Sequence, residues 1–176
     1  MTKQNIPMIG FVGPSGSGKT TLLCKVITAL RVRGIRIAAI KHSHHDIELD
    51  TPGKDSFELR KSGATQTILA SQRRWSLITE TPDNQQDASL RDLLRQIDGD
   101  AIDLVVVEGF KHEHFPKVEV YRPSLGKPAL YPDDEDIIAV ATDSESTVST
   151  AKKCLDLNDH EAITHYIIDT FGLLTT

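Results

Sequence analysis

Short apolar runs alternate with stretches of helical periodicity along this chain. The run 8–12 is apolar throughout and predicts a buried strand. Between 19 and 33, apolar residues recur at spacings of three and four, so this stretch predicts a helix that ends before Gly34. The same patterns predict further strands at 35–40, 67–70, 75–79, 102–107, 117–121 and 137–141, and further helices at 55–62, at 89–97 and after Asn158 or Asp159.

This order of strands and helices predicts an α/β fold in three layers, a mostly parallel sheet with helices on both faces. The polar stretch 81–88 is of ordinary loop length, so the whole chain, 1–176, is expected to be one domain. The alternating residues of 117–121 predict a strand with one exposed face, suited to a sheet edge. The acidic run 133–136 is interpreted as a solvated loop.

Composition narrows the class of protein. A net charge of -5 argues against broad nucleic-acid binding, because such proteins neutralise phosphates with a basic surface. Cys24 and Cys154 match no disulfide or metal spacing and indicate a reducing compartment, so we expect a cytoplasmic protein. No apolar run approaches the roughly 18–20 residues that cross a bilayer, so no membrane association is expected.

A glycine-rich segment follows the first predicted strand and opens the first predicted helix. With the residue after it, the segment consists of Gly13, Pro14, Ser15, Gly16, Ser17, Gly18, Lys19, Thr20 and Thr21. Glycines suit this position because successive backbone N–H groups must point at phosphate oxygens. Lys19 would reach the β- and γ-phosphates and Thr20 would bind Mg²⁺, next to a helix N-terminus that favours anions. The segment therefore predicts a nucleotide-binding P-loop and a P-loop NTPase fold.

The Mg²⁺ ion of such a site needs an acidic residue from a neighbouring strand. Asp103 and Glu108 both flank the apolar run of the strand 102–107. Five residues at roughly 3.3 Å each separate them by about 16 Å, so only one lies at the carboxyl end, where ligands bind in parallel sheets. We predict that Glu108 supports Mg²⁺ and, with Lys19, serves catalysis; the alternative is a solvent-facing acid. Asp103 is expected to have a turn or surface role at the opposite edge.

Two further strand ends bring polar residues to the same edge. Lys41 and His42 follow 35–40, where they would contact phosphate or a second ligand, or belong to an exposed basic loop. Asp143 follows 137–141, and a carboxylate accepts from the N1–H and amino group of guanine, which favours GTP over ATP. Capping of a turn is the alternative role for Asp143.

Several histidines and an aspartate gather around these strand ends. They are His42, His44, His45, Asp46, His112 and His114. Imidazole and carboxylate suit zinc or nickel, although the spacing matches no closed zinc motif. A polar loop around the γ-phosphate is the alternative interpretation.

The chain resembles the molybdopterin-guanine dinucleotide biosynthesis protein B family over nearly its whole length. Besides the P-loop, the matching segments are 40–46, 52–56 with Arg60 and 63–64, 79–82 and 104–113. The resemblance implies a GTP-binding homodimer with weak GTPase activity. It also implies an adapter role beside a separate guanylyltransferase, which joins GMP to molybdopterin, and beside other cofactor-biosynthesis proteins. The sequence shows no clear pterin site. Candidate contacts around the crevice at the carboxyl ends of the strands are Lys41, Lys54, Asp55, Arg60 and Lys111. Arg60 lies on a predicted exposed helix, where an ordinary surface arginine is the alternative.

The leading hypothesis is Mg²⁺-dependent GTP binding with slow hydrolysis. The sequence shows no evident water-positioning glutamine or arginine finger, so turnover without a partner should be slow. One alternative is a small-molecule kinase or transferase with its acceptor near Lys41 and Lys54. The other is a metal-delivery GTPase that uses the histidines.

Overall fold

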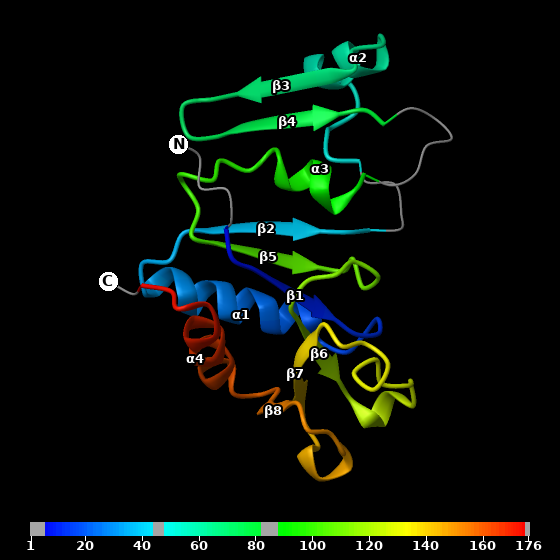
Figure 1. Ribbon diagram of the computed structural model, residues 1–176. Coiled ribbons are helices and arrows are strands. Elements are labelled where there is room, and N and C mark those ends of the chain that lie inside the picture. Colours follow the sequence, from blue (N-terminus) through cyan, green and yellow to red (C-terminus); the bar gives the residue numbers. More distant parts are fainter. Residues whose placement is uncertain (1–5, 44–47, 82–87, 175–176) are drawn as a thin grey trace. The chain divides into compact units, whose positions relative to one another are not determined.

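The computed structural model describes residues 6–43, 48–81 and 88–174, which form two compact units (Figure 1). The first unit comprises residues 1–42 and 94–176, and the second comprises residues 43–93. The expectation of one domain over 1–176 stays a prediction.

The first unit is built on a six-stranded parallel sheet with the strand order β2-β5-β1-β6-β7-β8 (Figure 1). The strands are β1 (Met8–Val12), β2 (Ile37–Lys41), β5 (Leu104–Glu108), β6 (Lys117–Tyr121), β7 (Ile137–Thr142) and β8 (Lys153–Asp156). The helices are α1 (Lys19–Val32) and α4 (His160–Phe171), with the short 3-10 turns η1 (Pro123–Leu125) and η2 (Glu145–Thr147). The α/β class with a parallel sheet is therefore confirmed.

A single apolar cluster joins one face of this sheet to α1 and α4. Phe11 of β1 packs in the same cluster as Val26 and Leu30 of α1 and Ile163 of α4. Burying a side chain of this size contributes about 1.5–3 kcal/mol, which is why the three-and-four spacing of α1 forms a helix here. Helix α4 begins where predicted, because the Asp159 carboxylate accepts from the backbone N–H of Ala162 at 2.9 Å.

The opposite face carries a smaller apolar cluster around β1 and β7. Val12, Ile137 and Val140 are buried there against Leu130 and Tyr131, which belong to the connection between β6 and β7. In this part of the described sheet the covering layer is therefore a loop segment.

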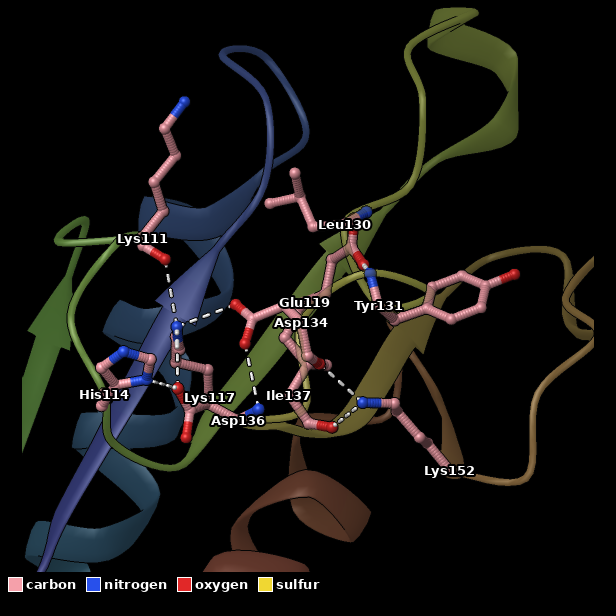
Figure 2. Close-up of polar contacts among 10 residues, drawn as sticks. All are labelled: Lys111, His114, Lys117, Glu119, Leu130, Tyr131, Asp134, Asp136, Ile137 and Lys152. Atoms are coloured by element: carbon pink, nitrogen blue, oxygen red, sulfur yellow. Dashed lines mark hydrogen bonds and ion pairs between the residues drawn. The ribbon is translucent and has the colours of Figure 1, made fainter.

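Strand β6 lies inside the sheet, hydrogen-bonded to β1 on one side and β7 on the other. The expectation that 117–121 forms an exposed edge is therefore wrong. Its first polar residue, Lys117, is only 1% exposed. The Lys117 ammonium donates to the Asp134 carboxylate at 2.8 Å and to the carbonyl of Lys111 at 3.0 Å, so its charge is paired inside the protein (Figure 2).

The second polar residue of β6, Glu119, is also fully buried. Its carboxylate accepts from the backbone N–H groups of Leu130 and Tyr131 at 2.8 and 2.7 Å (Figure 2). Alternation along 117–121 thus identified the residues that share a face, but that face is covered by protein.

The acidic run between η1 and β7 is only partly a solvated loop. Asp133 and Glu135 are exposed, as expected. Asp134 pairs with Lys117, and the Asp136 carboxylate lies 2.8 Å from Nδ1 of His114. The interpretation as a solvated loop is wrong for these two residues. Asp134 and, at 3.8 Å, Asp136 both pair with Lys117, and a buried lysine requires a carboxylate partner.

The second unit contains the antiparallel ribbon of β3 (Gln66–Ala70) and β4 (Trp75–Thr79) and the helix α2 (Asp55–Lys61), which packs against β3. Helix α3 (Leu90–Leu94) crosses the division between the units and is shorter than the predicted 89–97. Among the described residues, every helix is too short or too polar to cross a membrane.

Candidate phosphate-binding site

The glycine-rich loop connects the carboxyl end of β1 to the first turn of α1. Gly13, Gly16 and Gly18 have φ angles of 138°, 81° and 95°, a region that residues with a Cβ rarely adopt. A Cβ atom on Gly13 would lie 2.4 Å from the carbonyl oxygen of Val120, so this glycine also permits close approach to β6. Side chains are therefore disfavoured at all three glycines by the backbone conformation, and at Gly13 also by the lack of space.

Lys19 extends back over the loop that precedes it. Its ammonium donates to the carbonyl oxygen of Pro14 at 2.8 Å. Burial lowers the pKa of Lys19, the negative charge of Glu108 partly offsets this, and the positive charge of Lys41 lowers it further. A bound phosphate would favour the charged form of Lys19, because opposite charges at short range stabilise each other.

Glu108 ends β5 beside the first turn of α1. The Thr20 hydroxyl lies 2.9 and 3.0 Å from the two Glu108 carboxylate oxygens. The Glu108 side chain is mostly buried. A hydroxyl and a carboxylate are oxygen ligands of the kind that Mg²⁺ prefers, directly or through water. Thr20 and Glu108 are therefore the residues that could hold a magnesium ion.

Asp103 lies near the opposite end of the same strand. Its carboxylate accepts from the guanidinium of Arg36 at 2.7 and 2.9 Å and from the Arg36 backbone N–H at 3.0 Å. The expected surface role for Asp103 agrees with this contact, which joins the beginnings of β2 and β5.

The end of β2 contributes Lys41 to the same edge. Its ammonium lies 3.2 Å from a Glu108 oxygen, while its side chain remains 60% exposed. The next residue, His42, donates its backbone N–H to the Glu108 carbonyl at 2.9 Å. Its ring packs against Phe110 with a centroid separation of 4.6 Å. The structure thus brings Lys41 to the predicted acid and places His42 against the segment after β5.

The turn after β5 is fixed by a hydrogen bond from the buried Lys117 of β6. Gly109 and Phe110 both have positive φ angles, 101° and 52°, which is unusual for a phenylalanine. Lys117 donates to the carbonyl of Lys111, the residue that follows this turn (Figure 2). Lys117 therefore helps to fix the segment that leaves Glu108.

Asp143 follows β7 and forms an ion pair with Arg122, which follows β6. Arg122 also donates from Nε to the carbonyl oxygen of Ser17 at 2.9 Å. Arg122 is not among the residues predicted from the sequence, although Arg122 follows a strand at the same edge as Lys41 and Glu108. The strand-end rule would have found it had β6 been placed inside the sheet. The role of Asp143 in guanine recognition stays a prediction.

The remaining candidates lie away from these contacts or outside the described residues. His44, His45 and Asp46 fall in the segment 44–47, outside the described part of the chain. His114 pairs with Asp136, and no group of three potential metal-ligating side chains occurs among the residues that the structure describes. The metal-delivery hypothesis is therefore still a prediction.

Arg60 has an internal role within the second unit. Its guanidinium pairs with Glu48 and, at 3.0 Å, with Glu80, and it lies over the ring of Phe57. These contacts join α2 to the end of β4. They also account for the small exposure of the Arg60 side chain. Lys54 and Asp55 are exposed at the start of α2.

The parallel sheet and the glycine-rich loop between β1 and α1 together define a protein of the P-loop NTPase fold. The family model of molybdopterin guanine dinucleotide synthesis protein B matches residues 8–143. The chain belongs to this family.

Similar proteins support the assignment over most of the chain. The molybdopterin-guanine dinucleotide biosynthesis adapter protein of Escherichia coli is 48% identical over 95% of this chain and 94% of its own length. The protein of the same name from Haemophilus influenzae is 44% identical over 93% of this chain and 89% of its own. A crystal structure of molybdopterin-guanine biosynthesis protein B superposes with a TM-score of 0.74 at 26% identity, covering 94% of this chain and 99% of the other.

Proposed function

We propose that this protein binds GTP with Mg²⁺, hydrolyses it slowly and acts as an adapter in the biosynthesis of the molybdenum cofactor as molybdopterin guanine dinucleotide. The observation that carries the nucleotide proposal is the contact of Thr20 with Glu108 beside the glycine-rich loop. The adapter role is supported by the names of the similar proteins from Escherichia coli and Haemophilus influenzae.

The loop and its neighbours divide the work of binding. Backbone N–H groups of 13–18 and the Lys19 ammonium would bind the phosphate oxygens, and Thr20 with Glu108 would hold Mg²⁺. The metal ion would neutralise charge that develops on the phosphates during hydrolysis. The arginine beside the loop, Arg122, is engaged with Ser17 and Asp143, and this supports slow turnover. GTP hydrolysis by the purified protein at rates typical of kinases would contradict the proposal.

Guanine recognition is proposed for Asp143, which lies at the same sheet edge as the phosphate loop. Calorimetric titration of GTP, GDP and ATP into the wild type and Asp143→Ala tests it. We expect the wild type to prefer GTP, and the variant to bind GTP about tenfold more weakly, because a hydrogen bond to a charged group is lost. Equal binding of GTP and ATP that the substitution leaves unchanged would show that the base is not read here.

The proposed protein is a cytoplasmic homodimer that works beside a guanylyltransferase and other cofactor-biosynthesis proteins. Dimerisation is supported by the family resemblance. Strand β6 would offer a pairing edge only if it were exposed, and it lies between β1 and β7. Static light scattering should give about twice the chain mass of 19.4 kDa. A monomer mass at every concentration would contradict the proposal.

A kinase or transferase activity is the second candidate. It is favoured by Lys41, whose exposed side chain lies 3.2 Å from Glu108, where it could bind an acceptor next to the γ-phosphate. Phosphorus NMR of a reaction with GTP and pterin precursors separates the two functions. A phosphorylated acceptor supports the transferase, whereas inorganic phosphate alone supports hydrolysis.

A further inference from the structure

The carboxyl end of β6 supports the phosphate loop from outside. At its beginning, the loop approaches β6 so closely that a Cβ on Gly13 would overlap the Val120 carbonyl. At its other end, the guanidinium of Arg122 donates from Nε to the carbonyl oxygen of Ser17 at 2.9 Å. Ser17 is fully buried, so its carbonyl cannot bond to water and depends on a partner from the protein, which Arg122 supplies. Both ends of the loop thus contact the carboxyl end of β6 or the residue that follows it.

The bond from Arg122 fixes the orientation of one peptide group. The described chain has no cis peptide bonds, so the Ser17 carbonyl and the Gly18 N–H point in opposite directions. Because Arg122 holds the carbonyl on the β6 side, the Gly18 N–H is directed away from β6. A phosphate loop works by aiming such N–H groups at one ligand, and a peptide that can rotate would do so less well.

Arg122 is itself held by Asp143. The guanidinium nitrogen Nη1 forms an ion pair with Oδ2 of Asp143, and both side chains are about two-thirds buried. Exposed ion pairs usually contribute little, but this guanidinium joins a carboxylate and a backbone carbonyl in a fixed fork. The contact therefore connects the segment after β7 to the phosphate loop.

We propose that Arg122 is a positioning residue of the phosphate loop and that it acts only while Asp143 holds it. This inference rests on the proposed GTP binding and deepens it. A guanine base that bonds to Asp143 would contact the same carboxylate that orients Arg122. Base recognition and phosphate binding would then be coupled through two side chains, Asp143 and Arg122.

A double-mutant cycle tests the proposal. Mg²⁺-GTP is titrated calorimetrically into the wild type, Arg122→Ala, Asp143→Asn and the double variant. We expect Arg122→Ala alone to weaken binding about tenfold, on the scale of one hydrogen bond to a charged group. In the Asp143→Asn background, the same substitution should weaken binding by less than twofold. Arg122→Lys should recover only part of the loss, because one ammonium cannot bond as the planar fork does.

Chemical rescue separates positioning from general damage to the fold. Guanidinium chloride at low millimolar concentration should restore part of the GTP affinity of Arg122→Ala, whereas equal sodium chloride should not. The double variant should show no rescue, because it lacks the carboxylate that would hold the ion. Arg36→Ala is the matched control, since it removes an arginine that pairs with an aspartate at the opposite sheet edge. That variant should bind GTP like the wild type.

The outcomes identify which proposal fails. Unchanged GTP affinity in Arg122→Ala, or an equal loss in both backgrounds, overturns the positioning role. A loss without guanidinium rescue, together with a lowered unfolding temperature, also overturns it in favour of a purely structural ion pair. Absence of GTP binding by the folded wild type overturns the proposed function itself.

Discussion

Glu108 is the residue on which the chemistry of the proposed site depends. Its carboxylate faces a threonine hydroxyl from the P-loop and the ammonium of Lys41, within a mostly buried strand end. A buried carboxylate needs such partners, and a divalent cation would be a stronger one. The geometry therefore suits a residue whose charge is used when Mg²⁺ arrives with the nucleotide.

The substitution Glu108→Gln should weaken the dependence of GTP binding on Mg²⁺. Glutamine keeps the shape of the side chain but removes the charge that attracts the metal. We expect the Mg²⁺ concentration for half-maximal GTP binding to rise about tenfold, the scale of a lost charged contact. Titrating Mg²⁺ at fixed GTP measures this value. Asp103→Asn at the other end of β5 is the control, and an equal shift there would contradict the assignment.

Glu119 is a second buried carboxylate, and it should give the fold a pH dependence. Burial raises its pKa above the ordinary 4.5, and the N–H groups of Leu130 and Tyr131 oppose this. The folded protein then binds the proton more tightly than the unfolded chain, so this group's contribution to stability grows as the pH falls. It is lost again as the pH rises through the raised pKa.

Comparison with Glu119→Gln isolates that contribution. Urea unfolding measures the free energy of unfolding of both proteins at pH 7 and at pH 5. Relative to Glu119→Gln, the wild type should be more stable at pH 5 than at pH 7, because glutamine does not titrate. If the difference in unfolding free energy is the same at both pH values, or if Glu119→Gln gains relative stability at pH 5, burial does not dominate the environment of Glu119.

The connection between β1 and α1 shows how one element constrains another. Gly13→Ala and Gly16→Ala both place a side chain at a positive φ angle, which costs about 1–2 kcal/mol. Only Gly13 faces β6, where the added Cβ would lie 2.4 Å from a carbonyl, whereas nothing lies within 4 Å at Gly16. We therefore expect Gly13→Ala to reduce the free energy of unfolding by at least about 1 kcal/mol more, as for an overpacked core. Denaturant titration of both variants measures this, and equal losses would contradict the close approach to β6.

Most elements of the first unit followed from the sequence, because their apolar patterns are strong. Strand β1 and the helix after it were predicted within one residue, and the bounds of β6 were predicted correctly. Strand β8 was missed, since only one of its four side chains is buried and it has no apolar run. The place of β6 in the sheet could not be predicted, because the pattern records which residues share a face but not what covers that face.

The site, like the fold, could be predicted from the sequence only in part. The length of one strand separated Glu108 from Asp103, and the rule on strand ends brought Lys41 and Asp143 to one edge. The contact between Arg122 and Ser17 depends on β6 lying next to β1, which is information on strand order. The burial of Lys117 has the same origin. Residues fixed by local spacing were therefore found, and those fixed by the neighbour in the sheet were not.

At the scale of the whole molecule, the phosphate loop and its partners all belong to the first unit. The candidates Lys54, Asp55 and Arg60 belong to the second unit, where Arg60 forms ion pairs with two glutamates. The sequence predicts one domain, which requires the two units to unfold together. A ligand that binds only the first unit offers a direct test of that prediction.

Trp75 is the only tryptophan of the chain, it lies in the second unit, and its side chain is 69% exposed. Its fluorescence reports on that unit, while far-UV circular dichroism is dominated by the longer helices α1 and α4 of the first unit. Mg²⁺-GTP at 100 times its dissociation constant should stabilise the folded state by about 2.7 kcal/mol. If the chain is one cooperative domain, both signals should shift to the same higher denaturant concentration, because a two-state transition has one midpoint for every probe. A shift in circular dichroism without a shift in fluorescence would show that the second unit unfolds independently and that the single-domain prediction is wrong.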